Sequence, residues 1–207
     1  LTDWVIGDLL KRLADCGALD RTLIILTSDH GESLYEHHQF GHTSSLYNPA
    51  IHVPLIIRFP GGKWAGARIN KLVGHIDILP TILDVLDIDT PTATRGTSLV
   101  PELERGALPE RPLFCEVALP WVDEEAIISD GYKPMRDRAT GRVQLFEYPD
   151  DWEEEKDRSE ALPEVVSSME KDITAIRTTQ PQELIERGQS IPEDERVKRR
   201  LQDLGYL

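Results

Sequence analysis

The sequence predicts an α/β protein in two parts, a helix-and-strand part over residues 1–110 and a smaller α+β part over residues 111–207. Two aliphatic runs in the first part, Leu-Ile-Ile-Leu at 23–26 and Val-Pro-Leu-Ile-Ile-Arg-Phe at 53–59, are typical of buried strands because they lack polar alternation. In the second part the strand signals are shorter and turn residues separate them. The change of pattern near residue 111 therefore divides the chain.

Apolar spacing and helix-breaking residues place the elements of the first part. Its opening helix pattern ends at Gly17, and Pro80 is compatible with a later helix because it falls in the first turn. The expected order is a helix at 1–19, a strand at 22–28, a loop at 29–52 with a short helix near 44–47, a strand at 53–59, a short strand at 71–75, a helix at 76–86 and a connector at 90–112.

The second part is expected to contain an antiparallel sheet followed by an amphipathic helix. The acidic segment at 150–160 is interpreted as a solvated surface loop. The expected elements are short strands at 112–117, at 126–128 with 131–133, and at 143–147, a helix at 163–176, a polar stretch at 180–200 and a final helix at 192–204.

Composition excludes several classes of partner. The formal net charge is −14, from 37 acidic and 23 basic residues, whereas a nucleic-acid-binding face must be basic. No run of eighteen apolar residues is present, so no membrane span is expected. The two cysteines, Cys16 and Cys115, are expected to be reduced and buried, with a disulfide between them as the alternative.

The most informative motif is Asp29-His30-Gly31, directly after the first predicted strand. A carboxylate and an imidazole there suit a metal ion, and open α/β sheets place ligands at the carboxyl ends of strands. Neighbouring side chains on a regular strand point to opposite faces, so this pair can hold one ion only where the backbone turns, as Gly31 permits. The alternative interpretation is a strand that simply ends in a polar turn.

Histidines are concentrated around this motif. All six lie between residues 30 and 75, and four of them lie between residues 30 and 42. The loop at 29–52 that contains these four is long enough to suggest a function. His37 and His38 are expected to be solvent-exposed, with a role in substrate choice at the rim of the site as the alternative, and His52 is expected to be a strand-end residue. One of His75 and Asp77 is expected to cap the helix that follows them.

The order of the motifs resembles the sulfatase family of the alkaline-phosphatase-like superfamily. The similar segments are Ser-Asp-His-Gly-Glu at 28–32, Gly-His at 41–42, Val-Pro-Leu-Ile-Ile-Arg-Phe-Pro-Gly at 53–61, His-Ile-Asp-Ile-Leu-Pro-Thr at 75–81 and Leu-Gln-Asp-Leu-Gly-Tyr-Leu at 201–207. The resemblance implies a mixed or parallel sheet with helices, followed by a small antiparallel sheet with one helix. It also implies hydrolysis of sulfuric esters.

The resemblance assigns Asp29 and His30 as metal ligands and His42 as a catalytic residue that contacts the substrate. The implied cofactor is a divalent ion, Ca²⁺, Mn²⁺ or Zn²⁺, and an imidazole ligand favours Mn²⁺ or Zn²⁺ over Ca²⁺. His42 has two alternative roles, as a ligand of a second metal or as a structural residue. Glu32 is a candidate acceptor that orients His30.

The family's nucleophile is a formylglycine made from a Cys/Ser-x-Pro-x-Arg motif, and neither Cys16 nor Cys115 stands in such a motif. The resemblance therefore implies the carboxy-terminal part of an enzyme, inactive without an amino-terminal half that supplies formylglycine and two further aspartates. The implied substrate is a small anionic sulfate or phosphate ester, and a homo-oligomer is compatible with it. The alternatives are a phosphodiester or phosphonate monoester hydrolase, a phosphoglycerol transferase, or a non-catalytic binding module.

Overall fold

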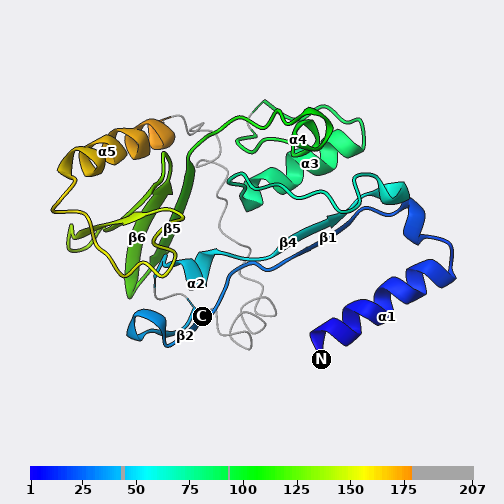
Figure 1. The fold of residues 1–207 in the computed structure, drawn as a ribbon, viewed down its shortest axis with the longest axis horizontal. Helices are drawn as coiled ribbons and strands as arrows, with labels where there is room; N and C mark the ends of the chain where they lie inside the picture. The colour runs from blue at the N-terminus through cyan, green and yellow to red at the C-terminus, as the bar shows by residue number, and fades with distance from the viewer. Residues whose placement is uncertain (43–44, 93, 179–207) are drawn as a thin grey trace, which may run out of the picture. The chain divides into compact units, whose positions relative to one another are not determined.

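The computed structural model describes residues 1–42, 45–92 and 94–178 (Figure 1). Two compact units, Leu1–Met169 and Glu170–Leu207, divide the chain, and the fold described below belongs to the first apart from the end of α5. The helices are α1 (Thr2–Asp15), α2 (Asn48–Ile51), α3 (Ile78–Val85), α4 (Val100–Arg105) and α5 (Pro163–Thr178). The strands are β1 (Ile24–Thr27), β2 (Ser33–Leu34), β3 (Phe40–Gly41), β4 (Leu55–Arg58), β5 (Leu113–Leu119), β6 (Val122–Ile128), β7 (Tyr132–Asp137) and β8 (Val143–Glu147).

The two aliphatic runs form β1 and β4, which confirms both predicted strands. They pair antiparallel, from Ile24 opposite Arg58 to Thr27 opposite Leu55. The expectation that both would be buried on two faces is wrong: β1 is half-buried up to an exposed Thr27, and Ile56 of β4 is 60% exposed. In the described residues each of these strands has a single partner strand, so much of the apolar surface stays accessible.

The long loop after β1 has internal structure that the sequence did not predict. Its first half is a β-hairpin, in which β2 pairs with β3 around a short 3₁₀ helix at Glu36–His38. The short helix expected near residues 44–47 is found one turn later, as α2. Proline at the second position explains that start, because a proline needs no amide hydrogen bond in a first turn.

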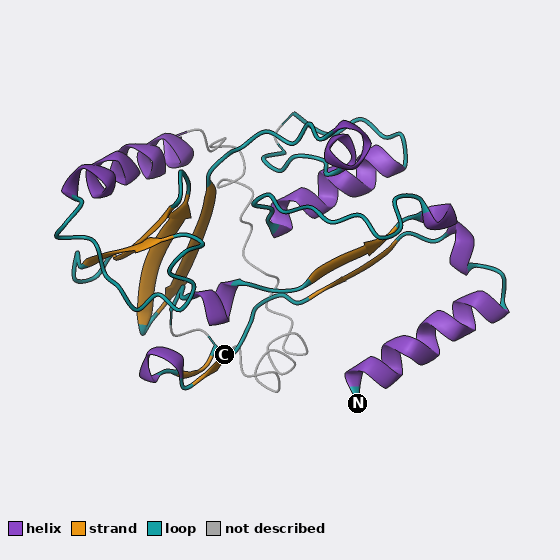
Figure 2. Ribbon diagram, in the orientation of Figure 1, coloured by secondary structure: helices purple, strands orange, loops and turns teal. Residues whose placement is uncertain are grey.

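The segment that precedes α3 differs from the expectation. Residues 71–75 are not a strand; instead Lys71 donates from Nζ to the carbonyl oxygen of Leu108 at 2.6 Å. Helix α3 itself is confirmed, with Pro80 as its third residue. The predicted connector contains an additional helix, α4, which ends where Gly106 takes a left-handed conformation, φ 66°. The remaining connections are drawn as loops in Figure 2.

The antiparallel sheet of the second part is confirmed, with strand order β5-β6-β7-β8. Its buried side chains include Ala126, Met135 and Phe146, and these form a core cluster with Leu46 from the loop before α2. Residues that are far apart in sequence therefore share one core. This packing fixes the end of the long loop on the sheet.

Three further expectations can be compared with the described residues. The amphipathic helix at 163–176 is confirmed as α5, whereas the final helix at 192–204 and the polar stretch at 180–200 lie outside the described residues. Both cysteines are free thiols, but the expected burial is wrong for Cys16, which is exposed, and Cys115 is only half-buried. No helix in the described ranges is long and apolar enough to cross a membrane.

Candidate active site

The Asp29–His30 pair lies just beyond β1, where the backbone leaves the strand direction. Ser28 donates from Oγ to the carbonyl oxygen of His30 at 2.7 Å, which closes a short turn around Asp29. The turn brings Oδ2 of Asp29 to 3.8 Å from Nε2 of His30. The two side chains therefore converge, as a shared ion would require.

The donor atoms of this pair fit a divalent metal ion. Transition metals bind oxygen and nitrogen ligands at about 2.1 Å, so one ion can contact two atoms that are 3.8 Å apart. Nδ1 of His30 lies 2.8 Å from the carbonyl oxygen of Gly31, and a carbonyl only accepts, so Nδ1 carries the proton and Nε2 keeps its lone pair. The Asp29 side chain is 74% exposed and open to an ion from solvent.

Local hydrogen bonds also keep Asp29 ionised. Its own backbone amide, and after it the amide of His30, which donates to Oδ1 at 3.1 Å, lowers the pKa of the Asp29 carboxyl. An ionised carboxylate is the form that binds a cation. Among the described residues, no three His, Cys, Asp or Glu side chains gather in a way that could hold a metal. The pair thus offers two donor atoms that an ion could bind.

His42 lies directly against this pair. Its ring stacks on that of His30, with centroids 4.1 Å apart and an interplanar angle of 23°. Nδ1 of His42 lies 3.2 Å from Oε2 of Glu32, and a carboxylate accepts the proton that this nitrogen carries. The hydrogen bond holds the ring in place and leaves Nε2 as the nitrogen that can act on a ligand. Glu32 therefore contacts His42, whereas the sequence suggested it as an acceptor for His30.

Gly31 has a different role from the one its sequence position suggested. Its φ is not in the left-handed region, so the turn does not require glycine for that reason. Instead, a Cβ at this position would lie 2.0 Å from the carbonyl oxygen of Pro49. The amide of Gly31 also donates to the carbonyl oxygen of Ala50 at 2.7 Å. Glycine is needed because α2 packs directly against the backbone beside His30.

The hairpin next to the site contains three non-glycine residues with positive φ, namely Tyr35, His37 and His38. His38 is exposed, as expected, whereas His37 is half-buried and stacks on Tyr47 with centroids 3.7 Å apart. Unusual backbone angles of this kind persist only where surrounding contacts impose them. The rim role of these histidines stays a prediction.

The remaining histidines have structural contacts. His52 ends α2 and packs edge-on against Trp152. The helix-capping expectation is wrong for α3: Asp77 stands at its N-cap position, but the Asp77 side chain makes no hydrogen bond to an α3 amide. Its carboxylate accepts instead from the amide of Gly74, at the start of the preceding 3₁₀ helix, at 2.8 Å. Nε2 of His75 lies 3.4 Å from Oγ1 of Thr27, at the end of β1, a placement that the sequence did not predict.

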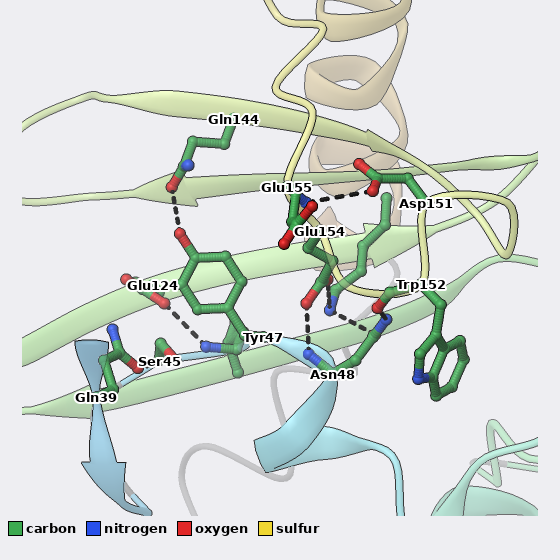
Figure 3. Close-up of polar contacts among 12 residues, drawn as sticks. Gln39, Ser45, Tyr47, Asn48, Glu124, Gln144, Asp151, Trp152, Glu154 and Glu155 are labelled. Atoms are coloured by element: carbon green, nitrogen blue, oxygen red, sulfur yellow. Dashed lines mark hydrogen bonds and ion pairs between the residues drawn. The ribbon is translucent and has the colours of Figure 1, made fainter. Parts of the chain in front are cut away.

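A set of buried polar residues behind the site was also missed. Asn48, at the start of α2, accepts from Lys133 of β7, and both contact Glu154 (Figure 3 labels Asn48 and Glu154). The acidic segment 150–160 was interpreted as a solvated loop, which is wrong for Glu154, since that residue is 3% exposed. The sequence offered one sign of this buried set, namely Lys133 within the predicted strand next to Pro134 and Met135. A lysine that is buried in a strand needs a buried partner for its charge.

A cavity of about 630 Å³ in the first unit has a lining of mixed polarity, which includes Arg68 and Asn70. Its lining includes Ile57 of β4, Phe59, Trp64 and Leu99, and none of the three predicted site residues.

Comparison with known proteins decides the family. The family model described as Sulfatase matches residues 1–88. Arylsulfatase K of Bos taurus is 32% identical over 188 residues, covering 84% of this chain and 34% of the relative. The chain belongs to the sulfatase family. It spans about a third of the length of the curated sulfatases that it matches.

Solved structures confirm the fold of this chain. A protein solved in complex with its substrate D-glucosamine-2-N,6-O-disulfate has a TM-score of 0.68 at 23% identity, covering 85% of this chain and 39% of that one. The phosphonate monoester hydrolase of Agrobacterium radiobacter has a TM-score of 0.69 at 24% identity, with 84% and 38% covered. The predicted alkaline-phosphatase-like α/β fold is thereby confirmed.

Proposed function

We propose that this chain supplies part of the active site of a metal-dependent sulfuric ester hydrolase. The single observation that supports the proposal most is the convergence of Asp29 and His30, 3.8 Å apart, with the His42 ring stacked on His30. This grouping places a carboxylate, a metal-binding nitrogen and a second imidazole together at one strand end. Family membership makes a sulfate ester the leading substrate.

In this proposal Asp29 and His30 are metal ligands, and the imidazole favours Mn²⁺ or Zn²⁺ over Ca²⁺. When bound, a divalent cation would offset the charge that develops on the ester oxygens. His42, held through Nδ1 by Glu32, would use Nε2 to bind an ester oxygen or to donate a proton to the leaving group. Glu32 keeps the ring oriented for that contact.

A formylglycine nucleophile and two further aspartate ligands would complete the site. We propose that they come from a segment outside the 207 residues, since the chain covers 34% of arylsulfatase K. The isolated chain would then be inactive. The substrate would be a small anionic ester, such as an aryl sulfate or a sulfated sugar of the kind bound by one structural neighbour.

A phosphonate monoester hydrolase is the second candidate. The similarity in fold to the Agrobacterium enzyme supports this candidate, and an Asp-His pair is suited to either ester. Both candidates need the same cation and the same proton donor. The identity of the ester therefore has to be measured.

The test is to assay the full-length enzyme against an aryl sulfate, a phosphate diester and a phosphonate monoester, with bound metal quantified. We expect the sulfate to be the preferred substrate, Asp29→Ala to lose both metal and turnover, and His42→Ala to keep metal while turnover falls at least 100-fold. Asp89→Ala, in an exposed loop, is the control and should behave as the parent does. If Asp29→Ala retains metal and turnover, the proposal is wrong. A preference for the phosphonate ester would favour the second candidate.

A further inference from the structure

Residue Asn48 is held by hydrogen bonds at both its backbone and its side chain. Its amide nitrogen donates to Oε2 of Glu154 at 2.7 Å, and its side-chain nitrogen donates to the carbonyl oxygen of Trp152 at 2.9 Å (Figure 3). Its side-chain oxygen accepts from Nζ of Lys133 at 2.9 Å. The start of α2 is therefore fixed by three hydrogen bonds to segments that are distant in sequence.

Lys133 and Glu154 form a buried ion pair beneath this residue. Nζ of Lys133 lies 2.5 Å from Oε1 of Glu154, and the two side chains are 0% and 1% exposed. Each carboxylate oxygen of Glu154 thus has a partner, one on Lys133 and one on Asn48. A buried ion pair is tolerated only when its geometry is good and its remaining bonding capacity is used, so the position of Asn48 is strongly specified.

From Asn48 the constraint continues to the candidate active site through one turn of helix. Two residues further on, the carbonyl oxygen of Ala50 accepts from the amide of Gly31, and the Pro49 carbonyl oxygen lies where a Cβ of Gly31 would be. Gly31 in turn accepts from Nδ1 of His30. A continuous series of short contacts therefore runs from the sheet to the imidazole.

We infer that Lys133, Glu154 and Asn48 are positioning residues, which hold α2 against Gly31 and so set the distance between Asp29 and His30. They do not reach the substrate or the ion. Their effect passes through the Gly31–Ala50 hydrogen bond. The expected effect on metal binding rests on the proposed function. The effect on the contact at Gly31 does not, and it can be measured separately.

The test uses two variants of the full-length enzyme. The double variant Lys133→Met/Glu154→Gln removes both charges together, because removal of one would leave the other buried without a partner. Asn48→Ala keeps the ion pair and removes the side-chain contacts to Lys133 and Trp152. We expect hydrogen exchange at the Gly31 amide to become at least 10-fold faster in both, and the Kd for Mn²⁺ to rise about 10–100-fold.

A matched control separates positioning from general loss of stability. Arg136 and Glu125 form another ion pair in the same sheet, directly opposite each other on β7 and β6, 2.6 Å apart with Glu125 1% exposed. The variant Arg136→Met/Glu125→Gln should lose stability to urea to a similar extent. Its Gly31 exchange rate and its Kd for Mn²⁺ should remain within about 2-fold of the parent.

The outcomes are distinct. If the hydrogen-exchange rate at the Gly31 amide and the Kd for Mn²⁺ are both unchanged in Asn48→Ala, the inference is wrong. Should the double variant fail to fold, the result with Asn48→Ala is sufficient to decide. It is also wrong if the control raises the Kd for Mn²⁺ as much as the test variants do. Retention of metal in Asp29→Ala would instead overturn the proposed function, whatever the exchange rate at Gly31.

Discussion

The amide of Gly31 donates to the carbonyl oxygen of Ala50 at 2.7 Å, which joins the residue after His30 to helix α2. The two backbones approach so closely that no side chain fits between them, because a Cβ on Gly31 would lie only 2.0 Å from the carbonyl oxygen of Pro49. The backbone of the candidate site is therefore built on a helix–turn contact. Three predictions follow from this contact and from two others in the fold.

Gly31→Ala should destabilise the protein by about 1–3 kcal/mol, because the new methyl group would lie 2.0 Å from the carbonyl oxygen of Pro49 and force the backbones apart. Urea unfolding measures the loss. Gly7→Ala is the control: this exposed glycine within α1 has no atom within 4 Å of an added Cβ. That change should stabilise the helix by up to about 1 kcal/mol. Equal stability of the two variants would contradict the close contact at Gly31.

Arg111→Met should be strongly destabilising, because it leaves the carboxylate of Asp77 buried without its cation. Asp77 is fully buried, its two oxygens also accept from the amides of Gly74 and Thr97, and Arg111 forms an ion pair with it. Removing one partner of such a pair costs about 3–5 kcal/mol. The measurement is again the free energy of unfolding in urea.

The control for this prediction is Lys11→Met, which breaks the ion pair of Lys11 with Asp15 on α1. Both side chains there are more than half exposed, 70% and 62%, so the loss should be about 0.5 kcal/mol or less. A similar small loss in Arg111→Met would show that Asp77 is not held as the structure indicates.

Asp137 should contribute stability that depends on pH. The Thr140 hydroxyl, followed by the amides of Thr140 and Ala139, lowers the pKa of the Asp137 carboxyl below 3.8. Because the folded pKa is below the unfolded one, the contribution is complete above pH 3.8 and is lost as the pH falls through the folded pKa. Asp137→Asn should therefore lower the melting temperature at pH 7, and the gap should narrow in strong acid. A gap that is constant from pH 7 to pH 2 would contradict the assignment.

The sequence predicted the fold wherever a pattern was long or chemically strict. The aliphatic runs gave β1 and β4, and the turn-separated strands gave the β5–β8 sheet. It missed the β2–β3 hairpin, whose strands are two residues each, too short to show alternation. It also assigned a strand to residues 71–75, where β propensity exists but no described strand pairs with them.

The candidate site was predicted to a similar extent. Adjacent Asp29 and His30 could be paired from sequence because a turn residue follows them, and the structure places them together. The support beneath them could not be predicted. Glu154 lies in a dense acidic segment, and local charge density indicates solvent exposure. Its burial depends on Lys133, 21 residues earlier, and on Asn48, 106 residues earlier, which only the folded chain brings together.

The end of the histidine-rich loop is bonded to strands far along the chain: Leu46 donates to Glu124 across 78 residues and Tyr47 to Gln144 across 97. A shortened protein that stopped before β5 would therefore lose these acceptors and expose Leu46. Truncations at residue 110 are thus a poor way to map the chemistry, since they would remove an internal support and not a dispensable appendage. Substitutions on β6 and β8 deserve the same attention in variant screens as those beside the histidines.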